Sequence, residues 1–555
     1  MAQIALSLHN TQQYNDAWFN LQLDDFQNCK ATTHTKRGEI EIVIWGDYAN
    51  QSFDNTIIRN INQNNYKSYD GRSWIVINKK ERKVFGCTDL FGLFPIFTYN
   101  KNNHWLITSS REALKKSITE TLTLNKAVLH QLIAYGQTFG NDSIFEDVKQ
   151  LANNSLFDLN INTNKLKIQQ TPNTTYYHQS NTVSYKHAKE AIIESVRNSF
   201  TKEENSFVSL SAGLDSRVIL SVCHLLKLKP KGICYGQLDS MDMKIAKQLA
   251  TTANIELVAP SKNTTVIKSA IENISNAGCG EVPIHHGHAL LNDSLLTKTK
   301  GHRIVTGTGA ETYRAFYYTR GLPGFSLFGL KCLNRFTHPK IKRYIQEELC
   351  KVYDLVKPLT KHIDSQDSLN IEEQIQTHLK TSMSGSQMAD DFYLNVRCQR
   401  MVVAGQQLLD SYYNRSHPFL RTEVVKCLFN LPTRYKINSH FHRKFICDIA
   451  PDLASIVWDK SGKPLKDGLP FLKLYPGISQ RLNLTSHYGK AAKPMYSYDF
   501  KNSELKPLFH LFSLLNINQE HYEQITSELI QKGSFNHIMG FALVWSELNT
   551  NKLDA

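Results

Sequence analysis

The sequence has no C-x-x-C pair, although it contains 10 cysteines among its 555 residues. Zinc ribbons and dithiol redox motifs need closely spaced cysteines, so the residues exclude both classes. No window approaches the roughly 18 uninterrupted apolar residues of a membrane span, and the first residues, MAQIALSLHNTQQ, lack a signal-peptide pattern. We therefore expect reduced thiols, no membrane partner and a cytoplasmic location.

Clusters of basic residues are also absent. The chain carries 64 Lys and Arg against 50 Asp and Glu, which gives a formal net charge of +14. This balance favours anions such as nucleic acid, a membrane surface or a nucleotide polyphosphate. However, the basic residues are spread along the chain with no block of five or more. The sequence therefore predicts no nucleic-acid partner.

A hydrolase nucleophile elbow, G-x-S-x-G, is missing as well. Residues 38–115 contain five strand-like runs: EIEIVIWG, SWIVIN, KVFGC, PIFTY and HWLITSS. Their spacing predicts antiparallel β structure with two faces to bury. We expect a helix over residues 125–136 and then strands and a linker in the Asn-, Thr- and Gln-rich residues 150–182.

The pattern changes at Ser184, a candidate N-cap for the helically spaced run SYKHAKEAIIESVRNSF. The stretches FVSLSAGLDSRVILSV, LKPKGICYGQ and DMKIAKQLATTAN then alternate strand and helix, as a doubly wound parallel sheet requires. From about residue 340 the helical period dominates. The predicted fold class is α/β, with an α+β domain at residues 1–183 and a parallel-sheet domain with a helical extension at residues 184–555.

The stretch FVSLSAGLDSRVILSV predicts a turn at the mouth of a helix, where unpaired N–H groups and the helix dipole attract anions. Gly213 lets the turn approach a phosphate, and the hydroxyl groups of Ser211 and Ser216 are donors for it. Asp215 fits beside a phosphate only if Mg²⁺ lies between them. The turn lacks both the Walker A lysine and the three-glycine dinucleotide spacing. The alternative is an ordinary capped turn.

The residues of this turn resemble the motif of a known superfamily. The run Ser211-Ala212-Gly213-Leu214-Asp215-Ser216 resembles the S-G-G-x-D-S pyrophosphate loop of the ATP pyrophosphatase superfamily, with Ala212 in place of the first glycine. The resemblance implies that the whole run binds the pyrophosphate of ATP. It implies a pyrophosphate site and leaves the substrate open.

Three further stretches are similar to the asparagine synthetase family, which includes β-lactam synthetases and lasso-peptide cyclases. RIVTGTGAETYR resembles S-G-E-G-x-D-E, which implies that Gly307 and Gly309 line the ATP site and that Glu311 joins Asp215 as a Mg²⁺ ligand. HPFLR resembles the family's P-F-L-D segment. IVWDKSGKPLKDG resembles the stretch with the catalytic lysine, which implies Lys460 first and Lys463 second. The alternatives are a surface turn with a solvated Glu and a basic loop whose lysines face water.

Two stretches of the first domain, DLFGLFPIFTY and WLITSSREALKK, are similar to class II glutamine amidotransferase domains of the Ntn type. Working enzymes of that class use an N-terminal Cys, whereas Ala2 follows Met1 here, so we expect a domain that does not hydrolyse glutamine. Thr308 replaces the Glu of S-G-E-G-x-D, which disfavours free asparagine as the product. Arg217, next to the loop, is predicted either to contact a phosphate or substrate carboxylate or to form a surface salt bridge.

The resemblance implies an AMP-forming carbon–nitrogen ligase with ATP and Mg²⁺ as cofactors. It would adenylate a small-molecule or peptide carboxylate and join it to an amine donor, and a homodimer is compatible with this expectation. The alternatives are an asparagine synthetase that uses ammonia or glutamine, a tRNA-modifying member of the superfamily, and a pseudoenzyme or binding module.

Two other groups of polar residues fit structural roles better. Asp242 is expected to cap or start the helix of DMKIAKQLATTAN. The stretch VPIHHGH places His285, His286 and His288 together, but adjacent histidines on a strand point to opposite faces. We expect a surface loop there, with a substrate-lining histidine or a metal site as alternatives.

Overall fold

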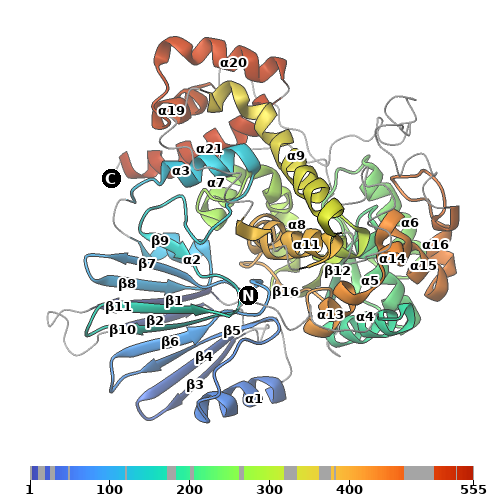
Figure 1. Ribbon diagram of the computed structural model, residues 1–555, viewed down its shortest axis with the longest axis horizontal. Helices are drawn as coiled ribbons and strands as arrows, with labels where there is room; N and C mark the ends of the chain where they lie inside the picture. The colour runs from blue at the N-terminus through green and yellow to red at the C-terminus, as the bar shows by residue number, and fades with distance from the viewer. Residues whose placement is uncertain are drawn as a thin grey trace.

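The computed structural model describes most of the 555-residue chain. The described residues are 3–9, 19–24, 32–47, 51–118, 122–171, 183–200, 206–261, 268–317, 334–361, 377–379, 383–467, 505–532 and 534–553. Within them, residues up to Gln170 form two antiparallel sheets, and residues from Ser206 onward form a parallel sheet (Figure 1). Residues 3–171 are called the antiparallel half below, and residues 183–553 the parallel half. Ala2 lies outside the described residues.

The antiparallel half contains a five-stranded sheet in the order β2-β1-β8-β7-β9 and a six-stranded sheet in the order β11-β10-β6-β5-β4-β3. The strands of the first sheet are β1 (Gln3–His9), β2 (Phe19–Asp24), β7 (Phe97–Lys101), β8 (His104–Thr108) and β9 (Val148–Gln150). Those of the second are β3 (Thr32–Arg37), β4 (Ile40–Gly46), β5 (Arg72–Asn78), β6 (Lys83–Cys87), β10 (Ser155–Asn160) and β11 (Lys165–Gln170).

Strand β4 shows why a continuous apolar run forms the middle of this half. Val43 and Trp45 lie in the main core together with strand β1, whereas Ile42 and Ile44 lie in a separate cluster beneath helix α1 (Gln51–Asn62). Neighbouring side chains on a strand point to opposite faces, so one run buries both. The predicted antiparallel structure with two buried faces is confirmed.

The helices of the antiparallel half begin and end at recognisable caps. Helix α2 (Arg111–Ser117) is capped by Ser110, and helix α3 (Lys126–Tyr135) by Asn125, whose side chain accepts from the Val128 N–H. Gly136 ends α3 in the left-handed conformation, with φ of 66°, which glycine adopts without strain. The helix predicted over residues 125–136 is therefore confirmed.

The parallel half is built on a five-stranded sheet in the order β14-β13-β12-β15-β16, in which every pairing is parallel. Its strands are β12 (Ser206–Ser209), β13 (Lys231–Ile233), β14 (Leu257–Val258), β15 (Arg303–Val305) and β16 (Asn414–Ser416). The chain passes from β12 outward to β14 and then returns to β15 on the other side of β12. The strand order therefore reverses between β12 and β15, and open α/β sheets bind ligands at such a point.

Helices connect these strands and form most of the remaining chain, which confirms the coarse α/β prediction. Helix α4 begins after Ser184, the predicted N-cap, whose side chain accepts from the His187 N–H. The main helices are α4 (Tyr185–Ser199), α5 (Leu214–Leu225), α6 (Met241–Ala253), α7 (Lys268–Gly278), α8 (Asp293–Thr299), α9 (Asn334–Thr360), α11 (Gly385–Phe392), α12 (Ala404–Gln407), α13 (Thr422–Asn430), α14 (Thr433–Lys436), α15 (His440–Ile449), α16 (Pro451–Ser455), α19 (Lys506–Leu514), α20 (Tyr522–Gln531) and α21 (Phe535–Leu553).

None of the helices in the described ranges combines the length and apolar character needed to cross a bilayer. The seven cysteines whose side chains are described, Cys87, Cys223, Cys234, Cys279, Cys398, Cys427 and Cys447, are all free thiols. This agrees with the expected reduced state of these seven.

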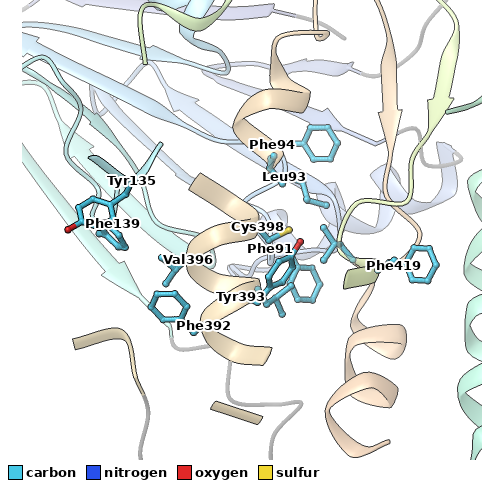
Figure 2. Close-up of a cluster of buried hydrophobic side chains, with 14 of the residues drawn as sticks. Phe91, Leu93, Phe94, Tyr135, Phe139, Phe392, Tyr393, Val396, Cys398 and Phe419 are labelled. Carbon is cyan, nitrogen blue, oxygen red and sulfur yellow. The ribbon is translucent and has the colours of Figure 1, made fainter. Parts of the chain in front are cut away.

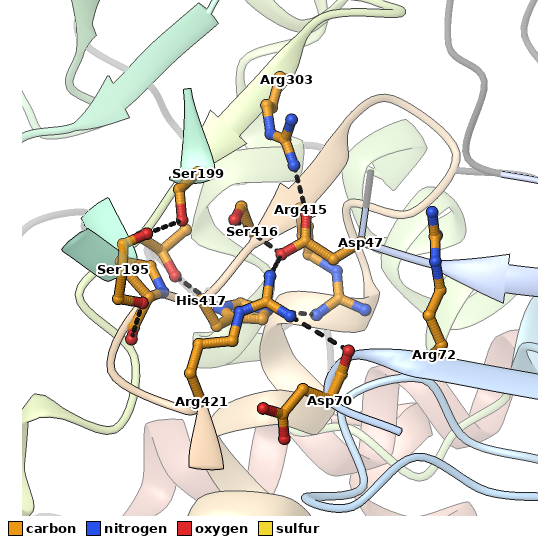
Figure 3. Close-up of polar contacts among 12 residues, drawn as sticks. Asp47, Asp70, Arg72, Ser195, Ser199, Arg303, Arg415, Ser416, His417 and Arg421 are labelled. Carbon is orange, nitrogen blue, oxygen red and sulfur yellow. Dashed lines mark hydrogen bonds and ion pairs between the residues drawn. The ribbon is translucent and has the colours of Figure 1, made fainter. Parts of the chain in front are cut away.

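A charged network joins the two halves (Figure 3). Asp47, at the end of β4, forms ion pairs with Arg303 and Arg421 and accepts a hydrogen bond of 2.8 Å from the Ser416 hydroxyl. Burial raises the pKa of Asp47, but Arg421 and Arg303 outweigh this effect and hold the pKa below its usual range. Arg421 also donates to the Asp70 carbonyl oxygen at 3.1 Å. One buried carboxylate of the antiparallel half thus neutralises two arginines of the parallel half.

Candidate active site

The residues Ser211 to Ser216 form the turn between β12 and the start of α5, so the predicted strand, turn and helix are confirmed. The Gly213 N–H donates to Ser211 Oγ at 3.2 Å, and the Ser211 N–H donates to Ser216 Oγ at 3.3 Å. The two hydroxyl oxygens are 3.3 Å apart. The turn therefore gathers both hydroxyl groups at the amino end of α5, where the N–H groups point outward.

The two apolar residues of this turn face the core. Ala212 is 2% exposed and Leu214 is fully buried, so only their backbone groups are available to a ligand. The Ala212 N–H already donates to the Asp242 carboxylate at 2.7 Å. Ala212 is not among the described residues with positive φ, and Gly213 has φ of −71°. The turn thus uses no left-handed backbone here, which is why alanine fits in place of glycine at residue 212.

The second predicted loop lies directly against the first, because β12 and β15 are neighbours in the sheet. A Cβ atom on Gly307 would lie 2.7 Å from the Asp215 Cβ and 3.0 Å from the Asp215 carbonyl carbon. Only glycine therefore lets the two turns approach so closely. Gly309 has φ of 90° and packs against Leu420 of the HPFLR segment. Glu311 follows in the 3₁₀ helix η2 (Ala310–Arg314).

The two predicted carboxylates converge on one arginine. Arg314 Nη2 lies 2.8 Å from Asp215 Oδ2 and 3.9 Å from Glu311 Oε1. His442 is fully buried, and its Nε2 lies 3.2 Å from Asp215 Oδ1. Glu311 Oε2 is buried with no hydrogen-bond partner among the described residues. Glu311 is therefore partly buried, with 21% of its side chain exposed, and is not the fully solvated Glu of the alternative.

The charges of this cluster depend on one another. Burial raises the pKa of Asp215, but Arg314 and then His442 and Lys460 outweigh it and hold the pKa below its usual range. Burial and the Asp215 charge together raise the pKa of Glu311, and Arg314 only partly opposes them. Burial lowers the pKa of His442 despite the nearby Asp215. The site thus places a carboxylate whose ionised form is favoured beside a second carboxylate whose ionised form is disfavoured.

The donor set of this cluster suits Mg²⁺. That ion is commonly held by one or two carboxylates and completes its shell with phosphate oxygens and water. Asp215 and Glu311 supply two carboxylates, and Glu311 Oε2 has a free acceptor in a buried position. Among the described residues, no group of three or more His, Cys, Asp and Glu side chains is arranged to hold a metal ion. Two carboxylates alone would leave most of the ligand positions of Mg²⁺ to phosphate oxygens and water.

The two candidate lysines lie close together in the chain. Both belong to a tight turn closed by an antiparallel bridge between Trp458 and Lys463, in which the Trp458 N–H donates to the Lys463 carbonyl at 2.9 Å. Lys460 lies at the tip, and its charge contributes to the lowered pKa of Asp215. Lys460 and Lys463 are both exposed to solvent. The charge of Lys460 thus acts on the carboxylate cluster, and both lysines remain accessible from solvent.

Arg217 holds this lysine turn against α5. Its guanidinium is completely buried and donates to the carbonyl oxygens of Ile456 and Val457 at 2.9 and 3.0 Å. Both sequence-based alternatives for Arg217, a ligand contact and a surface salt bridge, are therefore wrong. The helix that carries Asp215 and the turn that carries Lys460 are joined by this side chain.

Thr308, at the position where the resemblance expects Glu, is buried in a chain of hydrogen bonds. Its hydroxyl lies 2.9 Å from the Thr306 hydroxyl, which lies 2.8 Å from His417 Nδ1. His417 Nε2 is in turn 2.9 Å from Arg415 Nη1, and burial and then Arg415 lower the pKa of His417 well below its usual value. The HPFLR segment therefore supports the Gly307–Gly309 loop through these hydrogen bonds.

Arg314, His442 and Asp242 take part in the site without having been predicted to do so. Arg314 is three residues after Glu311, a spacing that places both side chains on one face of a helix and could have been noticed. His442 comes from α15 and has no local signal. Asp242 was expected to cap or start α6, and it does lie in the first turn of this helix, although Ser240 is the N-cap; its carboxylate also accepts from the Ala212 N–H.

The VPIHHGH stretch is not a surface loop, which corrects that expectation. Residues Ile284–Leu291 form the 3₁₀ helix η1, whose Ala289, Leu290 and Leu291 are buried in the cluster beneath α7. The three consecutive apolar residues that follow the histidines bury one side of this segment, and a prediction based on the histidines alone does not take them into account. The side chains of His285 and His288 lie outside the described part of the chain.

No model of a known protein family matches this chain, and no curated protein matches it in sequence. The case for a function therefore depends on the residues and geometry described above.

Proposed function

We propose that the protein is an ATP-dependent ligase that adenylates a substrate carboxylate, releases pyrophosphate and joins the acyl group to an amine. The observation that carries this proposal is the contact between two loops at the strand-order reversal. One loop brings two hydroxyl groups and Asp215 to the amino end of α5, and the other brings Glu311 beside them. Hydroxyl groups, helix N–H groups and paired carboxylates are the groups that a magnesium–pyrophosphate complex requires.

We further propose that residues 1–183 form an Ntn-type, class II amidotransferase-like domain and residues 184–555 an asparagine synthetase-like ATP pyrophosphatase domain. Two packed antiparallel sheets in the first part support this division. So do the parallel strand order of the second part and the position of the Ser211 to Ser216 turn at its reversal point.

The residues of the site have separate roles in the first step. A carboxylate oxygen of the substrate attacks the α-phosphorus of ATP, and the bond from that phosphorus to the bridging oxygen breaks. Ser211, Ser216 and the N–H groups at the start of α5 bind the departing pyrophosphate. Asp215 and Glu311 would hold Mg²⁺, which neutralises negative charge on the phosphates when bound. Lys460 faces the charge that develops on the α-phosphate.

In the second step an amine nitrogen attacks the acyl carbon, the bond from that carbon to the AMP oxygen breaks, and the nitrogen loses a proton. The ammonium group of Lys460 stabilises the negative charge of the tetrahedral transition state. The product is an amide, a lactam or an isopeptide, depending on whether the amine belongs to a second molecule or to the substrate itself.

Carboxylate-dependent exchange of labelled pyrophosphate into ATP tests this proposal. A panel of aspartate, other amino acids and peptide acids should give exchange with one class of acid. Glu311→Gln should lower the exchange rate about 100-fold or more, because it removes a charged group from the transition state. Lys460→Ala should lower amide formation similarly, whereas the matched variant Lys463→Ala should change it less than about twofold.

Other outcomes would contradict parts of the proposal. Exchange with aspartate and capture of the product by ammonia would make the protein an asparagine synthetase. ATP binding without exchange for any acid would favour the rival proposal of a binding module. The observation in favour of that rival is Arg314, which already places a cation between Asp215 and Glu311.

A further inference from the structure

Arg314 lies between the two carboxylates that the proposed function assigns to Mg²⁺. Its Nη2 atom is 2.8 Å from Asp215 Oδ2 and 3.9 Å from Glu311 Oε1. All three side chains are mostly buried but keep some contact with solvent. Ion pairs in such surroundings are stronger than ion pairs at a fully exposed surface. Because a guanidinium group stays protonated in proteins, the site has a permanent cation of its own.

The local backbone fixes this arginine beside the carboxylates. Glu311 and Arg314 are three residues apart in the 3₁₀ helix η2, where side chains at this spacing lie directly over one another. Gly309 precedes the helix with φ of 90°, and Ala315 follows it with φ of 54°. The left-handed conformation is uncommon for alanine, and such strained backbone is concentrated at functional sites. The single turn that carries Glu311 and Arg314 is therefore bounded by left-handed backbone at both ends.

The helix that begins at Tyr393 meets Glu311 with neutral side chains. Helix α11 continues without a break into η5, a π-helix over Tyr393–Val403, in which residues five apart lie on one face. Figure 2 shows Tyr393 and Cys398 on the face opposite to Phe392. Burial, followed by the charge of Glu311, raises the pKa of both the Tyr393 hydroxyl and the Cys398 thiol well above their usual values. Both side chains are therefore neutral and add no positive charge beside Glu311.

The charge of Arg314 makes the site a poor receptor for a metal ion on its own. Burial raises the pKa of Asp215, and among the basic groups that outweigh burial Arg314 has the largest effect. The side chains of Asp215, Glu311 and Arg314 together carry at most one net negative charge. A divalent ion that entered alone would meet this small charge and the repulsion of the guanidinium. A metal–polyphosphate complex brings negative charge of its own, and its phosphate oxygens are partners for the guanidinium.

We propose that Arg314 is the resident counter-ion of this carboxylate pair and prevents it from binding a divalent metal ion in the absence of nucleotide. The inference rests on the proposed function in one respect, which is that Asp215 and Glu311 are the metal ligands. It adds an order of binding to that function. The metal enters as its nucleotide complex, and the two carboxylates do not collect it beforehand.

Titration of the nucleotide-free full chain with Mn²⁺, followed by electron paramagnetic resonance, tests the proposal. Mn²⁺ suits the same oxygen ligands as Mg²⁺. Arg314→Gln should bind Mn²⁺ at least about tenfold more tightly than the unaltered protein, because the repelling charge is gone. Arg314→Lys keeps a positive charge and should stay within about threefold of the unaltered protein. Arg343→Gln is the remote control, because Arg343 forms an exposed pair with Glu347, and it should leave Mn²⁺ binding unchanged.

Three outcomes would overturn the proposal. The first is Arg314→Gln binding Mn²⁺ no more tightly than the unaltered protein. The second is a gain in affinity that survives Asp215→Asn in the Arg314→Gln protein, because the metal would then lie elsewhere. The third is saturable binding at micromolar Mn²⁺ by the unaltered protein that Asp215→Asn abolishes, and this measurement needs no change at Arg314 if that variant fails to fold.

The result is distinguishable from that of the proposed function, because pyrophosphate exchange does not enter the titration. Tight Mn²⁺ binding by Arg314→Gln without exchange by the unaltered protein for any acid would leave this inference standing and contradict the ligase. Exchange by the unaltered protein together with unchanged Mn²⁺ binding by Arg314→Gln would do the reverse.

Discussion

Asp391 is a carboxyl group that folding moves out of water. Burial raises its pKa to about 8 from the ordinary 3.8, and the hydrogen bond from Asn395 only partly opposes the shift. Between these two values the folded protein keeps a proton that the unfolded chain releases. The stability of the fold therefore decreases by about 1.4 kcal/mol for each unit by which the pH rises through this window.

Asp391→Asn should remove this dependence, since the amide has the same shape and does not titrate. We expect the free energy of unfolding of the variant to exceed that of the unaltered protein at pH 7, with a difference that shrinks toward pH 4. Urea unfolding at several pH values measures the difference. Asp158→Asn, on an exposed site of β10, is the control and should show no such trend. A pH-independent difference for Asp391→Asn would contradict the argument.

Residue identity predicted some members of the site and not others. The meeting of Asp215 and Glu311 was predictable, because both follow neighbouring parallel strands within recognisable loops. His442 was not predictable, because it reaches Asp215 from a helix more than 200 residues along the chain. Arg217 was misjudged because a charged residue beside a loop gives no sign that two carbonyl oxygens will bury it.

At the scale of elements, helix α6 supports the turn before α5. The Asp242 carboxylate in the first turn of α6 accepts the Ala212 N–H at 2.7 Å, and Ala212 is buried. This bond fixes the backbone of the candidate pyrophosphate loop from a neighbouring element.

Asp242→Ala should therefore leave a buried N–H group without a partner and lower the free energy of unfolding by about 1–3 kcal/mol. Because the loop is then held less firmly, affinity for ATP should decrease about tenfold if the proposed function holds. Asp242→Asn keeps an oxygen acceptor and should restore most of both losses. Chemical denaturation and ATP titration measure the two effects. Equal stability of the alanine and asparagine variants would contradict the supporting role of α6.

Secondary structure was predictable where the pattern is local. The strand-like run EIEIVIWG, the N-cap Ser184 and the helical run over residues 125–136 marked their elements correctly. Strand β16, with the sequence NRS, was not predictable, because its buried polar side chains pair with Asp47 of the other half and with the nearby Asp410. Helix α1 and the π-helix were also missed. A π-helix has no residue pattern of its own and depends on what packs against it.

At the scale of the whole molecule, the two halves share one hydrophobic core. The main cluster of buried side chains includes Ile4 and Trp45 of the antiparallel half together with Val208 and Phe445 of the parallel half. Asp47 adds a buried charge contact across the same boundary. These observations predict that the halves unfold together.

Asp47→Ala tests this coupling. The substitution leaves Arg303 and Arg421 without their shared carboxylate, and breaking a buried ion pair from one side lowers stability by about 3–5 kcal/mol. We expect one unfolding transition at a lower temperature, seen by calorimetry. Glu81→Ala breaks an exposed pair with Lys83 and should change stability by less than about 1 kcal/mol. Two separate transitions, of which only one shifts, would contradict the coupling.

The ion pairs that Arg303 and Arg421 both form with Asp47 also affect how fragments of this protein behave. A fragment that contains only the parallel half would retain Arg303 and Arg421 but lose the carboxylate that neutralises them. Its cut face would then present guanidinium groups to solvent, and such groups attract polyanions through counterion release. Nucleic acid that copurifies with the fragment would reflect this artificial surface, and washing at high salt would remove it.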